Sequence, residues 1–307
     1  MKMNSRTGLY LILIVLCIAG IITGSFFDLQ ISETLYAGDS LFSGIICFAT
    51  VIIFFESCIF FLGVLFRQLW VRYNSVLPRI VVSVIFIYLF CSTATLGGAK
   101  ILNDQLMQGS FSGLAGTLHG SFIAGSVFCI AAFVIGFSIN RNRQDAGTTK
   151  ILIKIIMIFT IGFLMSHYLN CMIDRQSYSV LVNGGNIDGF MPWYRLPKDS
   201  KLLMSFTDLI TSHQGSFVSS HALYAVLFII IFPSYSLAVP SLKKHEKLLM
   251  VIAGIVSVTV LLCRILSGNN YLTDISFGAL YSLKFSMSYN GISKSRKPGR
   301  FAHIFKK

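Results

Sequence analysis

The sequence predicts an all-α membrane protein: a polytopic bundle of transmembrane helices, with about eight spans and both termini in the cytoplasm. Only 12% of the 307 residues are charged and 54% are hydrophobic, whereas about a quarter of the residues in an ordinary soluble protein are charged. Apolar runs approaching the roughly 20 residues needed to cross a bilayer recur along the whole chain. We expect one integral membrane domain over residues 1–307, with spans near residues 8–27, 42–66, 79–98, 117–139, 151–173, 217–237, 248–266 and 272–289.

The segments between these runs differ in composition. The first run follows a short basic segment and no small-residue cleavage site follows it, so we interpret it as a membrane anchor. Residues 28–41 carry three acids and are typical of a short surface helix. Residues 99–116 are rich in Gly and Ser and indicate a loop. The long segment 174–216 contains Trp193 and Tyr194, which suit a membrane interface.

The net charge of +13 would indicate nucleic-acid binding in a soluble chain, but its distribution here indicates membrane topology. With both termini and the even-numbered loops placed in the cytoplasm, most of the 25 Lys and Arg residues fall on that side. This bias follows the positive-inside rule. We therefore expect a multi-pass protein of the cell membrane that does not bind nucleic acid. The basic tail 294–307 either lies on anionic headgroups or is solvated.

Ionisable and metal-binding side chains are sparse inside the spans. The seven cysteines lack the spacing of metal ligands, and we expect neither a metal nor a cofactor. Cys at such positions behaves as a small apolar residue. Cys171 and Cys263 both fall near external helix ends, and a disulfide between them stays open. Glu56, deep in the second span, is either a proton- or substrate-contacting group or a protonated or paired carboxyl of the bundle.

Three short polar segments border the predicted external face: residues 170–178, 216–222 and 263–274. Independent helix reversals place all three on the same side of the membrane and at the same depth, so we expect them to lie together. Polar and ionisable groups at such helix ends are costly and usually functional.

The chemistry of these segments suits the binding of an anion. Arg175 and Arg264 offer fork-shaped donors for phosphate oxygens. The positive end of the helix that begins near Ser219 would add free N–H groups. His221 can exchange a proton near neutral pH.

The second half of the chain, about residues 165–285, resembles the type 2 phosphatidic acid phosphatase and vanadium haloperoxidase family, particularly its bacterial membrane lipid phosphatases. Residues 190–194 (FMPWY) are similar to an F-x-P-W-Y element of some members. Residues 216–222 (SFVSSHA) are similar to S-F-P-S-G-H-A, and residues 268–274 (GNNYLTD) are similar to G-A-H-Y-L-T-D. The resemblance implies the lipid-phosphatase fold.

The resemblance also implies a role for each matching residue. His221 matches the acid that protonates the leaving group, and Asp274 matches the carboxylate that orients the nucleophile. Asn270 occupies the position of the nucleophilic histidine itself. In the first motif, Asn170 and Ser177 replace the expected Lys and Arg. The implied phosphate-binding residues are Arg175, Ser219, Ser220, Arg264, Asn170 and Ser177.

These replacements argue against the family's standard mechanism. Asn270 has no basic lone pair, so it cannot form the phosphohistidine intermediate. Loss of the nucleophile alone leaves about 10³–10⁴-fold of the rate enhancement, and each lost cation costs on the order of 3 kcal/mol. We therefore expect a catalytically degenerate protein, a pseudoenzyme, that binds a phosphorylated membrane lipid at the outer face or serves as a membrane-protein partner of an active enzyme.

Two other classes of function stay open. An active lipid phosphate or polyprenyl diphosphate phosphatase would use water directly or a recruited histidine, with His119, His167 and His213 as the candidates. A transporter or channel would need polar residues along a path across the membrane, and Glu56, His119 and His167 do not form one.

Overall fold

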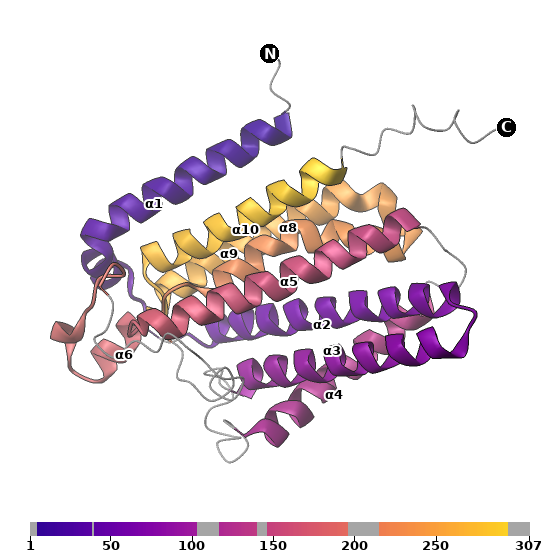
Figure 1. Cartoon of the computed structure of the whole chain (residues 1–307). Helices are drawn as coiled ribbons and strands as arrows, with labels where there is room; N and C mark the ends of the chain where they lie inside the picture. The colour runs from indigo at the N-terminus through magenta and orange to yellow at the C-terminus, as the bar shows by residue number, and fades with distance from the viewer. Residues whose placement is uncertain (1–4, 39, 103–116, 140–145, 196–214, 294–307) are drawn as a thin grey trace.

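The computed structural model describes residues 5–38, 40–102, 117–139, 146–195 and 215–293 (Figure 1). Every regular element in these ranges is a helix, as the sequence predicted. The elements are α1 (Ser5–Leu35), α2 (Leu41–Arg72), α3 (Val76–Leu102), α4 (Leu118–Ile139), α5 (Ala146–Ile173), α6 (Tyr178–Asn183), η1 (Ile187–Gly189), α8 (Ser220–Ala238), η2 (Pro240–His245), α9 (Glu246–Leu266) and α10 (Leu272–Ser293).

The described helices include seven segments that are long and apolar enough to cross a membrane, which makes the chain a multi-pass membrane protein. They are Tyr10–Leu35, Leu41–Arg72, Val76–Leu102, Leu118–Ile139, Gly147–Asn183, Ser220–Ala238 and Pro240–Leu266. The eighth expected span forms α10, which is more polar and falls outside this set. Its Ser276, Ser282 and Ser286 are buried. The exact number of spans and the side of the termini stay predictions.

The expectation of a short surface helix over residues 28–41 is wrong. Helix α1 continues through this segment as far as Leu35, and Asp28 is only 3% exposed. The reason lies in the spacing of three residues. Gly20, Gly24 and Asp28 are four residues apart along the chain and therefore share one face of the helix. That face lies against α10, which is the main contact of α1 (Figure 1).

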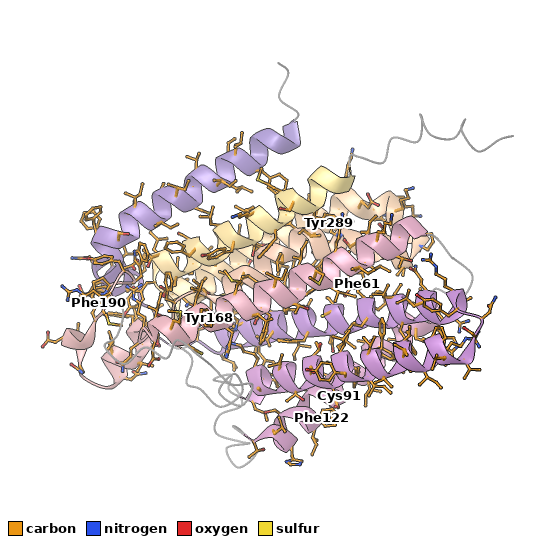
Figure 2. All side chains as sticks on the ribbon, viewed as in Figure 1. Phe61, Cys91, Phe122, Tyr168, Phe190 and Tyr289 are labelled. Atoms are coloured by element: carbon orange, nitrogen blue, oxygen red, sulfur yellow. The ribbon has the colours of Figure 1, made fainter. Side chains whose placement is uncertain are left out.

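Helix α2 lies in the middle of the bundle, between α3 and α4 on one side and α5, α8 and α9 on the other (Figure 1). Aromatic rings fill much of the space around it, and Figure 2 shows Phe61 among them. The ring of Phe54 stacks on that of Tyr224 with centroids 3.9 Å apart. Lipid tails are as apolar as these side chains, so close packing rather than removal from water favours the contact.

Helices α3 and α4 approach each other at glycine. A Cβ added to Gly98 would lie 1.7 Å from the carbonyl oxygen of Ser121, and one added to Gly125 would lie 1.7 Å from that of Ala94. Small residues at such crossings let two membrane helices come into backbone contact. The close crossing supports the last turn of α3, which carries Lys100.

Glu56 lies midway along α2 and is partly exposed. Its carboxylate acts electrostatically on Cys129 of α4 and Tyr235 of α8. Within the described ranges it makes no hydrogen bond and no ion pair. Both interpretations of this residue therefore stay open.

Polar helix ends gather at one end of the bundle, which we call the polar end. The N–H of Ala37, after α1, donates to the Leu266 carbonyl at the end of α9 (2.8 Å). The hydroxyl of Ser43, in the first turn of α2, donates to the Cys263 carbonyl (3.1 Å). These bonds hold the end of α1 and the start of α2 against the last turn of α9.

Candidate functional site

The polar end brings together the three polar segments of the second half of the chain. The Ser216 N–H donates to the Arg175 carbonyl (2.6 Å), which joins the segment after α5 to the one before α8. The Ser219 N–H donates to the Asp274 carbonyl (3.1 Å), which joins the start of α8 to that of α10. Residues far apart in the sequence thus form one backbone framework.

Asn270 is the centre of the hydrogen bonds in this framework. Its Oδ1 accepts from Arg264 Nε (2.6 Å) and from Ser219 Oγ (3.0 Å). Its Nδ2 donates to the Ser216 carbonyl (2.5 Å). An amide oxygen has two lone pairs, whereas an imidazole nitrogen has at most one. The side chain is only 2% exposed, and it links the segment before α8 to the end of α9 with bonds that an imidazole would not reproduce.

The second motif begins α8. Ser219 is the N-cap residue, and its Oγ accepts from the Ala222 N–H (3.3 Å) while donating to Asn270. This bond satisfies one of the N–H groups that have no partner inside a helix. Ser220 follows as the first helical residue and is buried. Both serines lie at the positive end of the helix dipole.

Arg175 is fully buried and carries the only ion pairs between described residues. Its NH1 donates to Asp274 Oδ1 (2.8 Å) and its NH2 donates to Asp28 Oδ2 (2.9 Å). We call Asp28, Arg175 and Asp274 the buried triad. The guanidinium also lies 3.8 Å from the ring centre of Tyr271 and 5.1 Å from that of Phe190, the residue that follows η1.

Asp274 binds both Arg175 and the start of its own helix. Its Oδ1 accepts from Arg175, and its Oδ2 accepts from the Tyr271 N–H (2.9 Å). No hydrogen bond joins this carboxylate to Asn270 in the described part of the chain. Burial raises the pKa of the adjacent Tyr271 phenol above its ordinary value. Asp274 is therefore engaged in the first turn of α10 and in holding Arg175.

A second group of basic side chains includes Arg264, which donates to Asn270. Arg264 and Lys100 both act electrostatically on His221, and we call these three residues the cationic zone. Lys100 is buried, while Arg264 is partly exposed and makes no ion pair with any described residue. His221 Nε2 is buried and hydrogen-bonds to no atom of the described residues. Arg264 has no carboxylate partner within the described ranges.

The two replaced residues of the first motif have different surroundings. Asn170 is buried, and its Nδ2 donates to the Val218 carbonyl (3.4 Å). Its Oδ1 lacks a partner among the described residues. Ser177 precedes α6 instead, where its Oγ lies 3.2 Å from Ser179 Oγ. The structure thus brings Asn170 to the start of α8 and places Ser177 at the next helix.

The remaining histidine and cysteine candidates lie outside these contacts. The buried ring of His167 stacks on Phe163, with centroids 5.7 Å apart. His119 is exposed in the first turn of α4, and His213 lies outside the described residues. Cys171 Sγ lies 3.8 Å from His167 Nε2, and Cys171 and Cys263 do not form the disulfide left open by the sequence.

Two residues at the polar end, Asp28 and Lys100, were missed by the sequence reasoning. The signal for Asp28 was the spacing Gly20-x3-Gly24-x3-Asp28, which puts a carboxylate on a face able to approach another helix closely. Lys100 lay in a segment interpreted as a loop. Its position directly after Gly97-Gly98-Ala99 indicated a tightly packed helix end.

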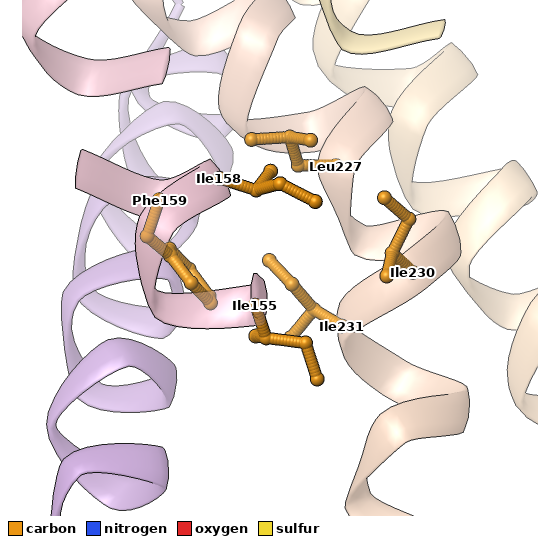
Figure 3. A pocket seen from close by; sticks show the side chains of 6 residues that line it. All are labelled: Ile155, Ile158, Phe159, Leu227, Ile230 and Ile231. Atoms are coloured by element: carbon orange, nitrogen blue, oxygen red, sulfur yellow. The ribbon is translucent and has the colours of Figure 1, made fainter. Parts of the chain in front are cut away.

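A hollow between α5 and α8 is separate from this polar cluster. It is lined by six apolar side chains (Figure 3): Ile155, Ile158, Phe159, Leu227, Ile230 and Ile231. Phe159 precedes Asn170 by eleven residues, or about 16 Å along a helix. No group of His, Cys, Asp and Glu within the described ranges could hold a metal ion.

No family model and no curated protein matches this sequence. Among solved structures, the chain is similar to the crystal structure of a transmembrane PAP2-type phosphatidylglycerolphosphate phosphatase from Bacillus subtilis. That similarity has a TM-score of 0.35 and 19% sequence identity, and it covers 71% of this chain and 98% of that chain. A TM-score this low carries no conclusion about activity, so the function has to be inferred from the geometry of the site.

Proposed function

We propose that this membrane protein binds a phosphorylated lipid headgroup at the outer face of the membrane and does not hydrolyse it. One observation carries the proposal. The terminal nitrogens of Arg264 and the Nε2 of His221 make no hydrogen bond to a described residue, and both Arg264 and buried Lys100 act electrostatically on His221. Donors gathered in this way fit an anion with several acceptor oxygens.

Electrostatics supports a phosphate group as the ligand. Arg264 uses Nε to bind Asn270, so its terminal NH2 groups are left for a ligand. A planar guanidinium matches two phosphate oxygens at once. The N-terminus of α8 adds the positive end of a helix dipole beside His221. A phosphorylated lipid brings such an anion to the membrane surface while its tails stay in the bilayer.

The absence of turnover is the second half of the proposal. A side chain at position 270 would have to attack phosphorus, and Asn270 instead accepts two hydrogen bonds and donates a third. The carboxylate that would orient a nucleophile, Asp274, is paired with Arg175. The side chains at the nucleophile position and at the orienting-carboxylate position, Asn270 and Asp274, are thus both engaged in bonds within the protein.

Binding is tested with purified protein in phosphatidylcholine nanodiscs that contain increasing amounts of phosphatidate. We expect Arg264→Gln to weaken phosphatidate binding about tenfold or more, since a hydrogen bond to a charged group contributes roughly 1.5–3 kcal/mol. Arg195→Gln is the matched control, because Arg195 is exposed on the segment after α6. Equal affinities of the two variants would contradict the proposed site.

Catalysis is tested by phosphate release from phosphatidate and from a polyprenyl diphosphate. We expect no release by the natural protein, and none by Asn270→His, because the new imidazole would find Asp274 already paired. Robust turnover that His221→Ala abolishes would overturn the proposal. Turnover that His167→Ala abolishes would instead identify an active phosphatase with a recruited histidine.

A further inference from the structure

The carboxylate of Asp28 is held as a bound anion would be held. Its Oδ1 accepts from the Thr273 N–H in the first turn of α10 (3.1 Å). Its Oδ2 accepts from the Thr273 hydroxyl and from Arg175 NH2 (2.9 Å). A helix N-terminal amide, a hydroxyl and a guanidinium are the donors that proteins use for phosphate oxygens. Arg175 Nε, also buried, has no partner among the described residues.

The helix that delivers this carboxylate packs most closely against α10, along one face. Gly20 and Gly24 of α1 meet Ser276 and Thr273 of α10 so closely that an added Cβ would lie 2.3 Å from Ser276 Oγ and 2.7 Å from Thr273 Cγ2. Among the described spanning helices, α9 is the only other one with more than marginal contact to α1, and Trp193 Nε1 donates to Ser25 Oγ of α1 (2.9 Å). Little of the apolar stretch of α1 is buried. Helix α1 thus covers the site from the lipid side.

Charge selects the ligand that could take the place of Asp28. The buried triad holds two carboxylates around one guanidinium. A singly charged anion in place of the Asp28 carboxylate would keep this balance, whereas a phosphomonoester dianion would add a further buried negative charge, which is costly. The phosphodiester of an ordinary anionic phospholipid carries one negative charge. It is also present at the membrane surface next to α1.

We propose that Arg175, Thr273 and the first-turn amide of α10 form a second anion site, that the chain's own Asp28 fills this site, and that the phosphodiester of an anionic phospholipid occupies it when α1 moves away from α10. The site is separate from the cationic zone of Arg264 and does not depend on the proposed function. Helix α1 is then a tethered ligand that competes with lipid.

The first test counts the phospholipids retained by the purified full chain, by native mass spectrometry in detergent with phosphatidylglycerol as the probe. Asp28→Ala removes the internal carboxylate. Glu33→Ala is the matched control, since Glu33 is exposed on the same helix and its replacement changes the charge equally. We expect Asp28→Ala to retain one more phosphatidylglycerol than the natural chain. The affinity of Asp28→Ala for this lipid should exceed that of the natural chain at least about tenfold. Glu33→Ala should behave as the natural chain does.

The second test keeps Asp28 in place and measures the position of α1. In Gly20→Cys/Ser276→Cys the two thiols would be close, because an ideal Cβ at Gly20 lies 3.3 Å from Ser276 Cβ and disulfides join Cβ atoms about 3.5–4.5 Å apart. We expect phosphatidylglycerol to slow formation of this disulfide and phosphatidylcholine to have little effect. The single variant Gly20→Cys corrects for the natural cysteines.

Two results would overturn the proposal. The first is a folded Asp28→Ala chain that retains the same number of phosphatidylglycerol molecules as Glu33→Ala. The second is a rate of disulfide formation that does not respond to phosphatidylglycerol, which would mean that lipid does not compete with α1. The second measurement stays decisive even if Asp28→Ala fails to fold.

Discussion

Arg175 and Arg264 lie at the same end of the bundle and have opposite surroundings. Arg175 is fully buried, pairs with two carboxylates and has aromatic rings against its guanidinium. Arg264 is partly exposed and makes one side-chain hydrogen bond, to the neutral amide of Asn270. The first arginine is held by the chain's own carboxylates and is open to a lipid anion only if Asp28 leaves, whereas the second retains donors for a ligand.

The difference shows what decides the role of an arginine at a membrane helix end. Arg175 has acids from α1 and α10 within hydrogen-bond distance, and a buried charge needs such partners. Arg264 remains partly exposed and needs none. The motif alone indicates that an arginine is present, whereas the nearby acids determine whether it can receive a phosphate.

Truncation of the two arginines should separate these roles most strongly. We expect Arg175→Ala to lower the free energy of unfolding by about 3–5 kcal/mol, because it leaves two buried carboxylates without their cation. Arg264→Ala should lower it by less than about 1.5 kcal/mol, the usual value of one hydrogen bond. Both changes are measured by thermal unfolding in detergent. Equal losses of stability would mean that the triad is no more structural than Arg264.

The sequence could predict the helices and the meeting of the polar segments, because hydrophobic runs and helix reversals determine both. It could not predict the partner of Arg175. The motif resemblance implied a phosphate ligand, while the structure pairs this residue with Asp28 from the first helix. That pairing depends on the approach of α1 to α10, and only the Gly20-x3-Gly24 spacing indicated it. The electrostatic effect of Lys100 on His221 likewise depends on how α3 packs.

The α1–α10 contact offers the next largest effect. We expect Gly24→Ala to lower the free energy of unfolding by about 1–3 kcal/mol, as overpacking usually does. The reason is that the new methyl would lie 2.6 Å from Asp28 Oδ1. Gly254→Ala is the control, because its Cβ would meet no atom within 4 Å, and it should be neutral or slightly stabilising. Thermal unfolding of the two variants decides the point, and a neutral Gly24→Ala would show that α1 is free to shift without cost.

The smallest effect concerns two serines, each at the N-cap of a helix, that the motif resemblance treats alike. The Ser219 hydroxyl accepts from the Ala222 N–H and donates to Asn270, whereas Ser177 makes no side-chain cap bond to α6. Loss of a bonded cap costs about 0.5–2 kcal/mol, so Ser219→Ala should lower stability by about 1 kcal/mol and Ser177→Ala by less than about 0.5 kcal/mol. The two midpoints of thermal unfolding in detergent provide the comparison. A larger loss of stability in Ser177→Ala than in Ser219→Ala would contradict this prediction. It would mean that the bond between Ser219 and Asn270 does not hold the start of α8 against the turn before α10.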